Sequence, residues 1–97
     1  LAETRWRSSW LIRRARVRLG CGEAAGGHAD LLAAIGELNQ RLLCGAHPDP
    51  GLLAERGLAF ALLGDTSLAK RDLSAARKLG ADRSALRPLE LALAALL

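Results

Sequence analysis

Residues 50–83, PGLLAERGLAFALLGDTSLAKRDLSAARKLGADR, contain the pattern that decides the fold. Apolar and small residues recur in this stretch at helical spacing, and Gly64 with Asp65 interrupts them at the middle. Glycine permits a sharp reversal of the chain, so the pattern predicts two amphipathic helices joined by a tight turn. Asp49 before Pro50 is typical of a helix start, and Gly80 is typical of a helix end. The positions that carry the pattern are Leu53, Gly57, Phe60, Gly64, Ala69, Leu73 and Ala76.

The same pattern occurs a second time, 42 residues earlier in the chain. Asp65 corresponds to Glu23, and Gly57 corresponds to Ala15, which are near-equivalents in charge or size. Identical residues stand at seven pairs of positions: Leu53 and Leu11, Arg56 and Arg14, Gly64 and Gly22, Asp72 and Asp30, Leu73 and Leu31, Ala75 and Ala33, and Ala76 and Ala34. The chain is therefore predicted to repeat one helix–turn–helix unit.

This spacing resembles that of the tetratricopeptide repeat (TPR), a helix–turn–helix unit of about 34 residues. The first unit departs from the family pattern, because Arg18 replaces an aromatic residue and Gly27 replaces an alanine. Its longer spacing places about eight extra residues within 36–49, in a longer second helix or a longer connector. The resemblance implies an all-α fold, a TPR-like antiparallel helix–turn–helix array (α-α superhelix) with a C-terminal packing helix. An unrelated five-helix bundle with the same spacing is the alternative.

We expect a single helical-repeat domain, with repeat one at about 4–45, repeat two at 50–83 and a C-terminal helix at 84–97. The second helix is expected to be regular from His28, because Gly26 and Gly27 weaken its first turn. The last helix is expected to start at Asp82 or Ser84 and to become regular only at Pro88, since proline disfavours helical geometry at the residue before it.

Composition supports helices and raises the question of an anionic partner. Hydrophobic residues make up 51% of the 97 residues, alanine and leucine dominate, and β-branched residues are rare. The formal charge is +4, and six arginines against one glutamate fall within residues 1–20. Such a basic block is typical of contact with nucleic acid or a membrane surface, or of a solvated helix face. Because Trp6 and Trp10 fall on the apolar side of the first helix, we expect them in the core and nucleic acid to be an unlikely partner.

Other chemistry is weak in this sequence. No apolar run approaches the ~18 residues of a membrane span, and the N-terminus does not read as a secretory signal. Cys21 and Cys44 are separated by a helix of roughly 24 Å, too far for a disulfide, so we expect reduced thiols and a cytoplasmic, bacterial-type protein. Cys44 and His47 form only half of a zinc site, so neither metal nor cofactor is expected. Without a set of catalytic residues, and without a methionine, the chain is expected to be a non-enzymatic module or a fragment of a longer protein.

The resemblance also implies a binding face. In TPR proteins the first helix of each repeat lines a groove that holds a peptide or a partner helix, which here gives Ile12, Arg13, Arg16, Glu55, Leu58 and Leu62 as candidate residues. Arginine grips carboxylates in a bidentate fork, so the expected partner is a protein or peptide with acidic and apolar character. A carboxylate clamp of the chaperone-binding type is not expected, because Ile12, Arg16 and Glu55 occupy its positions.

Three other interpretations of the function stay open. The basic first helix could bind nucleic acid, the chain could be a helical accessory domain of a larger enzyme or regulator, and the very apolar last helix could mediate self-association.

Overall fold

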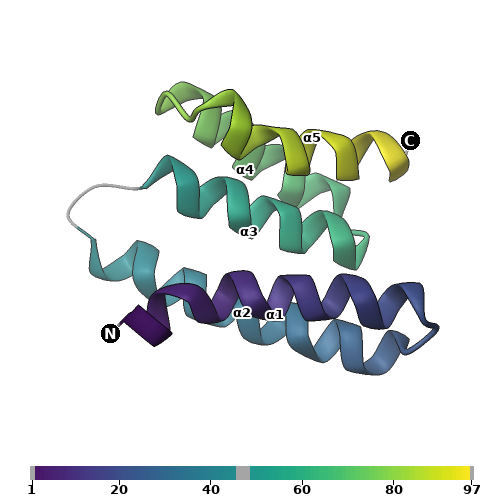
Figure 1. The fold of residues 1–97 in the computed structure, drawn as a ribbon. Helices are drawn as coiled ribbons and strands as arrows, with labels where there is room; N and C mark the ends of the chain where they lie inside the picture. Colours follow the sequence, from purple (N-terminus) through teal and green to yellow (C-terminus); the bar gives the residue numbers. More distant parts are fainter. Residues whose placement is uncertain (1, 46–48, 97) are drawn as a thin grey trace.

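The computed structural model describes residues 2–45 and 49–96, with side chains from Arg7 onward. These residues form five α-helices and no strand, so the predicted all-α class is confirmed (Figure 1). The helices are α1 (Ala2–Gly20), α2 (Ala24–Cys44), α3 (Pro50–Leu63), α4 (Thr66–Lys78) and α5 (Arg83–Leu96). The first four helices form two antiparallel hairpins, α1/α2 and α3/α4, which stack on each other, and α5 packs against α3 and α4.

The turns of the two hairpins share one geometry. Gly22 and Gly64 both have positive φ angles, 85° and 89°, which favour glycine. In each turn the glycine amide donates to the carbonyl three residues earlier, and the next amide donates to the carbonyl five residues earlier. The four bonds are Gly22 to Leu19 (3.2 Å), Glu23 to Arg18 (2.7 Å), Gly64 to Ala61 (3.0 Å) and Asp65 to Phe60 (2.9 Å). The internal sequence match is therefore a match in backbone structure.

The extra residues of the first unit lengthen a helix and not a connector. Helix α2 has 21 residues and α4 has 13, and α2 is longer at its C-terminal end. Contrary to the expected weak start, α2 is helical from Ala24, with Gly26 and Gly27 inside it. A Cβ atom on Gly27 would lie 2.8 Å from Leu19 Cγ and 3.2 Å from the Ala15 carbonyl oxygen. The close approach of α1 to α2 therefore favours glycine at this position, because a larger residue would displace Leu19.

The last helix begins between the two expected starts, Asp82 and Ser84. Helix α5 starts at Arg83, and Pro88 lies inside it, so the expectation that the helix becomes regular only at Pro88 is wrong. The amides of Ala85 and Leu86 donate to the carbonyl of Asp82 at 3.0 and 3.1 Å, which starts the helix before the proline. Burial explains why the first turn survives, because Leu86 is only 7% exposed and holds that turn against the core.

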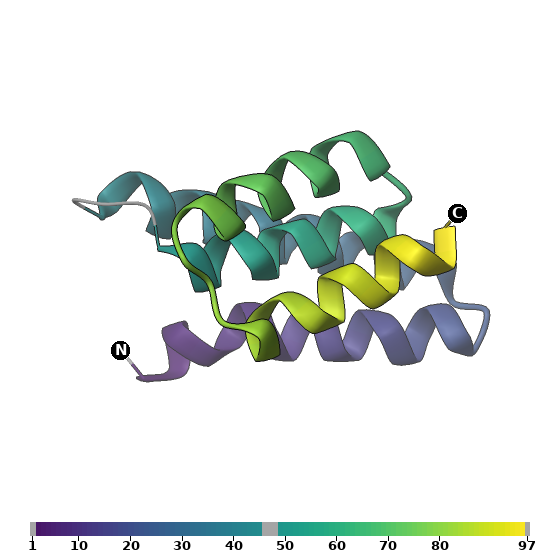
Figure 2. The same ribbon diagram turned by 90° about the horizontal axis from the view of Figure 1, so that it is seen from above.

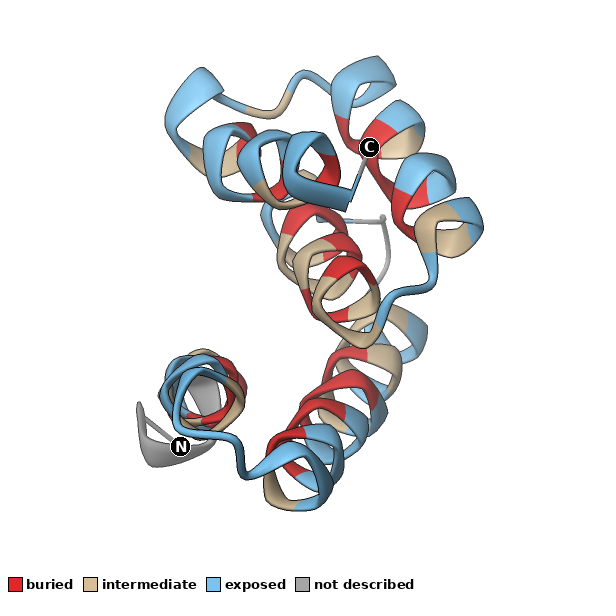
Figure 3. Ribbon diagram, turned by 90° about the vertical axis from the view of Figure 1, so that its right-hand side faces the viewer, coloured by how far each residue is buried: buried red, intermediate tan, exposed pale blue. Residues whose placement is uncertain are grey.

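The core consists of two apolar clusters joined by α3 (Figure 3). One cluster lies between α3, α4 and α5 and contains Leu53, Leu73 and Leu89. The other lies between α1 and α2 and takes in Ala59 of α3. Seen nearly along the helices in Figure 3, α1 and α5 flank α3 on one side, while α2 and α4 lie on the other. No contact joins α1 to α5 among the described residues, so α3 forms the floor between them.

The side of α1 that was predicted to be buried differs in part from the side that is buried in the structure. Trp10 is 54% exposed, although it was expected in the core, and Val17 on the same side is 67% exposed. The Trp10 ring instead covers the guanidinium of Arg14, whose Cζ atom lies 4.4 Å from the ring centroid. The side of α1 that is buried consists of Ser8, Leu11, Ile12 and Ala15. The Trp6 side chain lies outside the described residues.

Candidate binding groove

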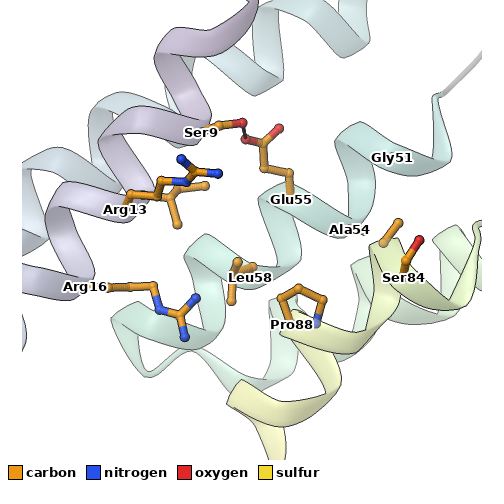
Figure 4. Close-up of a pocket in the computed structure, with 11 residues that line it drawn as sticks. Ser9, Arg13, Arg16, Gly51, Ala54, Glu55, Leu58, Ser84 and Pro88 are labelled. Carbon is orange, nitrogen blue, oxygen red and sulfur yellow. Dashed lines mark hydrogen bonds between the residues drawn. The ribbon is translucent and has the colours of Figure 1, made fainter.

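The space between α1, α3 and α5 is a groove of about 410 Å³ (Figure 4). Figure 2 shows from above how these three helices run along one another. Each helix contributes one wall or the floor: Ser9, Ile12, Arg13 and Arg16 from α1; Gly51, Ala54, Glu55 and Leu58 from α3; and Ser84, Ala85 and Pro88 from α5. The first helices of the two hairpins therefore share one concave surface, completed by α5.

Two exposed cations point into this groove. Arg13 and Arg16 come from adjacent turns of α1, and neither forms an ion pair within the described part of the chain. Three neighbouring arginines are already paired with carboxylates of the first hairpin. These pairs are Arg7 with Glu37 at 3.4 Å, Arg14 with Asp30 at 2.6 Å, and Arg18 with Asp30 at 3.4 Å. Among the described arginines of α1, those without an ion pair therefore lie on the groove side.

Glu55 lies on the floor of the groove but is engaged by α1. Its Oε1 atom accepts hydrogen bonds from the hydroxyls of Ser9 at 2.5 Å and Ser8 at 3.3 Å. Ser8 is fully buried, so this contact joins the two hairpins below the surface of the groove. Because Glu55 turns toward the serines, Arg13 and Arg16 remain available to an external carboxylate (Figure 4).

The apolar side chains that line the groove are most buried on α1 and α3 and most exposed on α5. Ile12 and Ala54 are 4% and 2% exposed, and Leu58 is half-buried. The Pro88 ring is exposed and forms the opposite wall. A proline has no amide hydrogen, so the regular helical bond to the Ser84 carbonyl is missing on this wall.

Of the six candidate residues, the structure brings five together. Ile12, Arg13, Arg16, Glu55 and Leu58 all line the groove. The sixth candidate does not line it: Leu62 is half-buried and packs against the α1/α2 cluster.

Sequence reasoning missed the wall formed by α5, which contributes Ser84, Ala85 and Pro88. A signal for it existed, because Ser84 follows Pro50 by the repeat length of about 34 residues. Helix α5 lies against α3 and α4.

On the other side of α3, two Arg–Asp pairs hold the hairpins closed. Asp30 accepts from Arg14 Nε at 2.9 Å and from Nη2 at 2.6 Å, and Asp72 accepts from Arg56 Nε at 2.8 Å and from Nη2 at 2.7 Å. The hydrogen bonds from Arg14 lower the pKa of the Asp30 carboxyl, and those to Asp72 raise the pKa of Arg56. Both aspartates are buried, so these pairs are structural and lie apart from the groove.

Metal and membrane sites find no support in the described residues. Cys21 and Cys44 are free, exposed thiols, and His47 lies outside the described residues. No group of three or more His, Cys, Asp or Glu residues gathers in the part of the chain that the structure describes. Among the same residues, no helix combines the length and apolar character needed to cross a bilayer.

Comparisons of the chain with protein-family models, with curated proteins and with solved structures give no match. The TPR resemblance therefore stays a prediction, which rests on the internal pattern of this sequence. The geometry that bears on function is that of the groove itself.

Proposed function

We propose that this chain is a non-enzymatic protein-binding module whose groove between α1, α3 and α5 holds a peptide segment or helix of another protein. The observation that carries this proposal is the pair Arg13 and Arg16, which face an apolar groove without a carboxylate partner among the described residues. A charge-assisted hydrogen bond to a carboxylate stabilises a complex more than a neutral one does. The ligand that fits best has acidic side chains toward α1 and apolar side chains toward Leu58 and Pro88.

The test is a peptide-display selection against the immobilised chain, followed by fluorescence polarisation of labelled copies of the selected peptides. We expect enrichment of Asp or Glu beside Leu or Phe. The double variant Arg13→Glu/Arg16→Glu should weaken binding by about tenfold or more, since each charged hydrogen bond contributes about 1.5–3 kcal/mol. The control Lys70→Glu/Lys78→Glu changes net charge equally on the outer face of α4 and should bind as the parent does.

Two results would contradict this function. One is a selection without enrichment over an empty matrix, and the other is equal binding of the selected peptides by the groove variant and the parent. Circular dichroism checks the fold of both variants, which we expect to be retained because Arg13, Arg16, Lys70 and Lys78 are all exposed.

Nucleic acid is the second candidate ligand, favoured by one observation. Trp10 is 54% exposed beside the Arg14 guanidinium, so its ring has a free area on which a base could stack. Against this, the arginines of α1 are partly paired with carboxylates: Arg7 and Arg14 with residues of α2, and Arg18 with Glu23 between α1 and α2. This pairing reduces the positive electrostatic potential that would attract phosphates. Polarisation of a labelled single-stranded oligonucleotide at low and physiological salt tests this candidate. Binding tighter than that of the selected peptides would move it to first place.

Self-association through the last helix remains a prediction. Helix α5 places Leu86, Leu89 and Leu93 in the core and leaves Leu91 60% exposed and Leu96 45% exposed. Sedimentation velocity over a range of concentrations tests it, and a monomer at the highest concentration would contradict it.

A further inference from the structure

The outer face of α1 carries an apolar stripe that nothing covers among the described residues. We define the α1 outer stripe as Trp10, Arg14, Val17 and Cys21, which follow one another at intervals of three and four residues on one side of the helix. Trp10 and Val17 are 54% and 67% exposed, and Cys21 is exposed. This stripe points away from both the core and the groove.

The second hairpin shows what covers the same face in this molecule. The residues of α3 that correspond to the stripe are Leu52, Arg56, Ala59 and Leu63. Ala59 is fully buried in the α1/α2 cluster, and Leu63 packs against that cluster. A helix, α2, therefore lies over this face of α3, whereas the equivalent Val17 is two-thirds exposed on α1.

The arginine in the stripe has a hydrogen-bond donor that a covering helix could satisfy. Arg56 uses Nε and Nη2 to hold Asp72, and its Nη1 donates to Oδ1 of Asn39 on α2 at 2.9 Å. Arg14 holds Asp30 in the same bidentate manner, but its Nη1 has no hydrogen-bond partner in the described part of the chain. An oxygen acceptor on a covering helix would complete the pattern.

Charge decides which kind of helix fits. Arg14 and Arg18 share one buried carboxylate, Asp30, at 2.6 and 3.4 Å, so an acidic acceptor beside Arg14 is favoured over a neutral one. Helix α4 of a second copy is a poor occupant, because its outer face carries Lys70, Arg71 and Lys78 and would repel these arginines.

We propose that the α1 outer stripe docks an amphipathic, acidic α-helix of another protein, seated on α1 as α2 is seated on α3. Its apolar residues cover Trp10 and Val17, and an Asp or Glu accepts from Nη1 of Arg14. This site is separate from the groove, which lies on the concave side of α1.

The test uses the full chain with Trp6→Phe, so that Trp10 is the only tryptophan and reports on the stripe. The probe is a stapled helical peptide of residues 28–45 of this chain with Asn39→Asp and Cys44→Ser, which copies the covering helix and supplies the carboxylate. We expect a saturable blue shift of Trp10 emission, and binding at least tenfold weaker for the same peptide with Asn39→Lys. Unchanged Trp10 emission up to millimolar peptide would overturn the proposal.

Matched variants assign the binding to the stripe. Val17→Asp should abolish the blue shift, and Leu32→Asp on α2 should not, although Leu32 is 62% exposed and equally apolar. Both side chains are exposed, so both variants keep the fold. Arg16→Glu, which alters only the groove, should leave the affinity for this peptide unchanged. The proposal for the stripe can therefore be contradicted independently of the proposal for the groove. Peptide affinity unaltered by Val17→Asp would overturn the proposal.

Discussion

The two hairpins of this molecule share their internal bonds and differ in their surroundings. Each has a glycine with positive φ at its turn and a buried aspartate held bidentately by an arginine. The second hairpin is covered by α2 on one side and by α5 on the other, whereas the outer face of α1 is bare among the described residues. The shared features are thus those that hold one hairpin together, and the differing features lie where the hairpin meets its neighbours.

The two hairpins also differ in the sizes of the residues at which their two helices pack against each other. The first places Leu19 against Gly27, and the second has Ala61 and Ala69 at the equivalent positions. A second difference lies at the arginine–aspartate pairs. Asp30 has a further arginine, Arg18, at 3.4 Å, whereas Phe60 occupies that place in the second hairpin. These two differences give direct tests of how far the hairpins are equivalent.

The largest loss in the free energy of unfolding is expected from replacing Arg56. The variant Arg56→Met leaves the buried Asp72 carboxylate without its arginine, and breaking a buried ion pair costs about 3–5 kcal/mol. Because the Arg56 side chain is 25% exposed, we expect a loss near the lower end, about 3 kcal/mol, in the free energy of unfolding measured with urea. Arg14→Met should cost less, since Arg18 still faces Asp30.

The comparison with Arg14 is the informative part of this experiment. The double variant Arg14→Met/Arg18→Met removes both cations from Asp30 and should bring the loss in the first hairpin close to that of Arg56→Met. If Arg14→Met alone is as damaging as Arg56→Met, then Arg18 contributes nothing and the hairpins are equivalent at this position.

A smaller effect is expected from exchanging the small residues between the hairpins. Gly27→Ala brings a methyl group to 2.8 Å from Leu19 Cγ, and overpacking of this kind costs about 1–3 kcal/mol. The gain in helix propensity, about 1 kcal/mol, offsets part of it. Leu19→Ala/Gly27→Ala recreates the alanine pair of the second hairpin, so the double-mutant cycle should show a favourable coupling of about 1 kcal/mol. Additive changes in the free energy of unfolding would show that the two residues do not constrain each other.

The sequence allowed the hairpins to be predicted because their signals are local. The glycine at each turn and the matching Arg and Asp residues make their contacts within one hairpin. All of them recur after 42 residues, so the sequence repeat shows them. The six candidate groove residues follow from their positions in the repeat, as the TPR resemblance implies, and five of them line the groove.

The errors lie where contacts between units decide the structure. Trp10 is apolar and correctly spaced, but in the described structure no helix covers it, so its ring packs on Arg14 and stays half exposed. Pro88 would end an isolated helix, yet tertiary burial of Leu86 and Leu89 keeps α5 helical on both sides of it. Leu62 was assigned to the groove by its position in the repeat, whereas the stacking of α3 on the first hairpin turns it toward the core.

The smallest expected effect is a change in the stability contribution of Asp30 at acidic pH. Hydrogen bonds from Arg14 lower the pKa of Asp30 in the folded chain below that of an unfolded aspartate, about 3.9. A carboxyl group with a lowered folded pKa stabilises the fold above its unfolded pKa, and this contribution is lost as the pH falls through the folded value. The difference in thermal midpoint between the parent and Asp30→Asn should therefore be constant near neutral pH and shrink below about pH 4. Ile35→Val, which removes no ionisable group from the same cluster, should give a difference that does not change with pH. A gap for Asp30→Asn that persists unchanged into strong acid would show that the ionised pair with Arg14 does not stabilise the first hairpin.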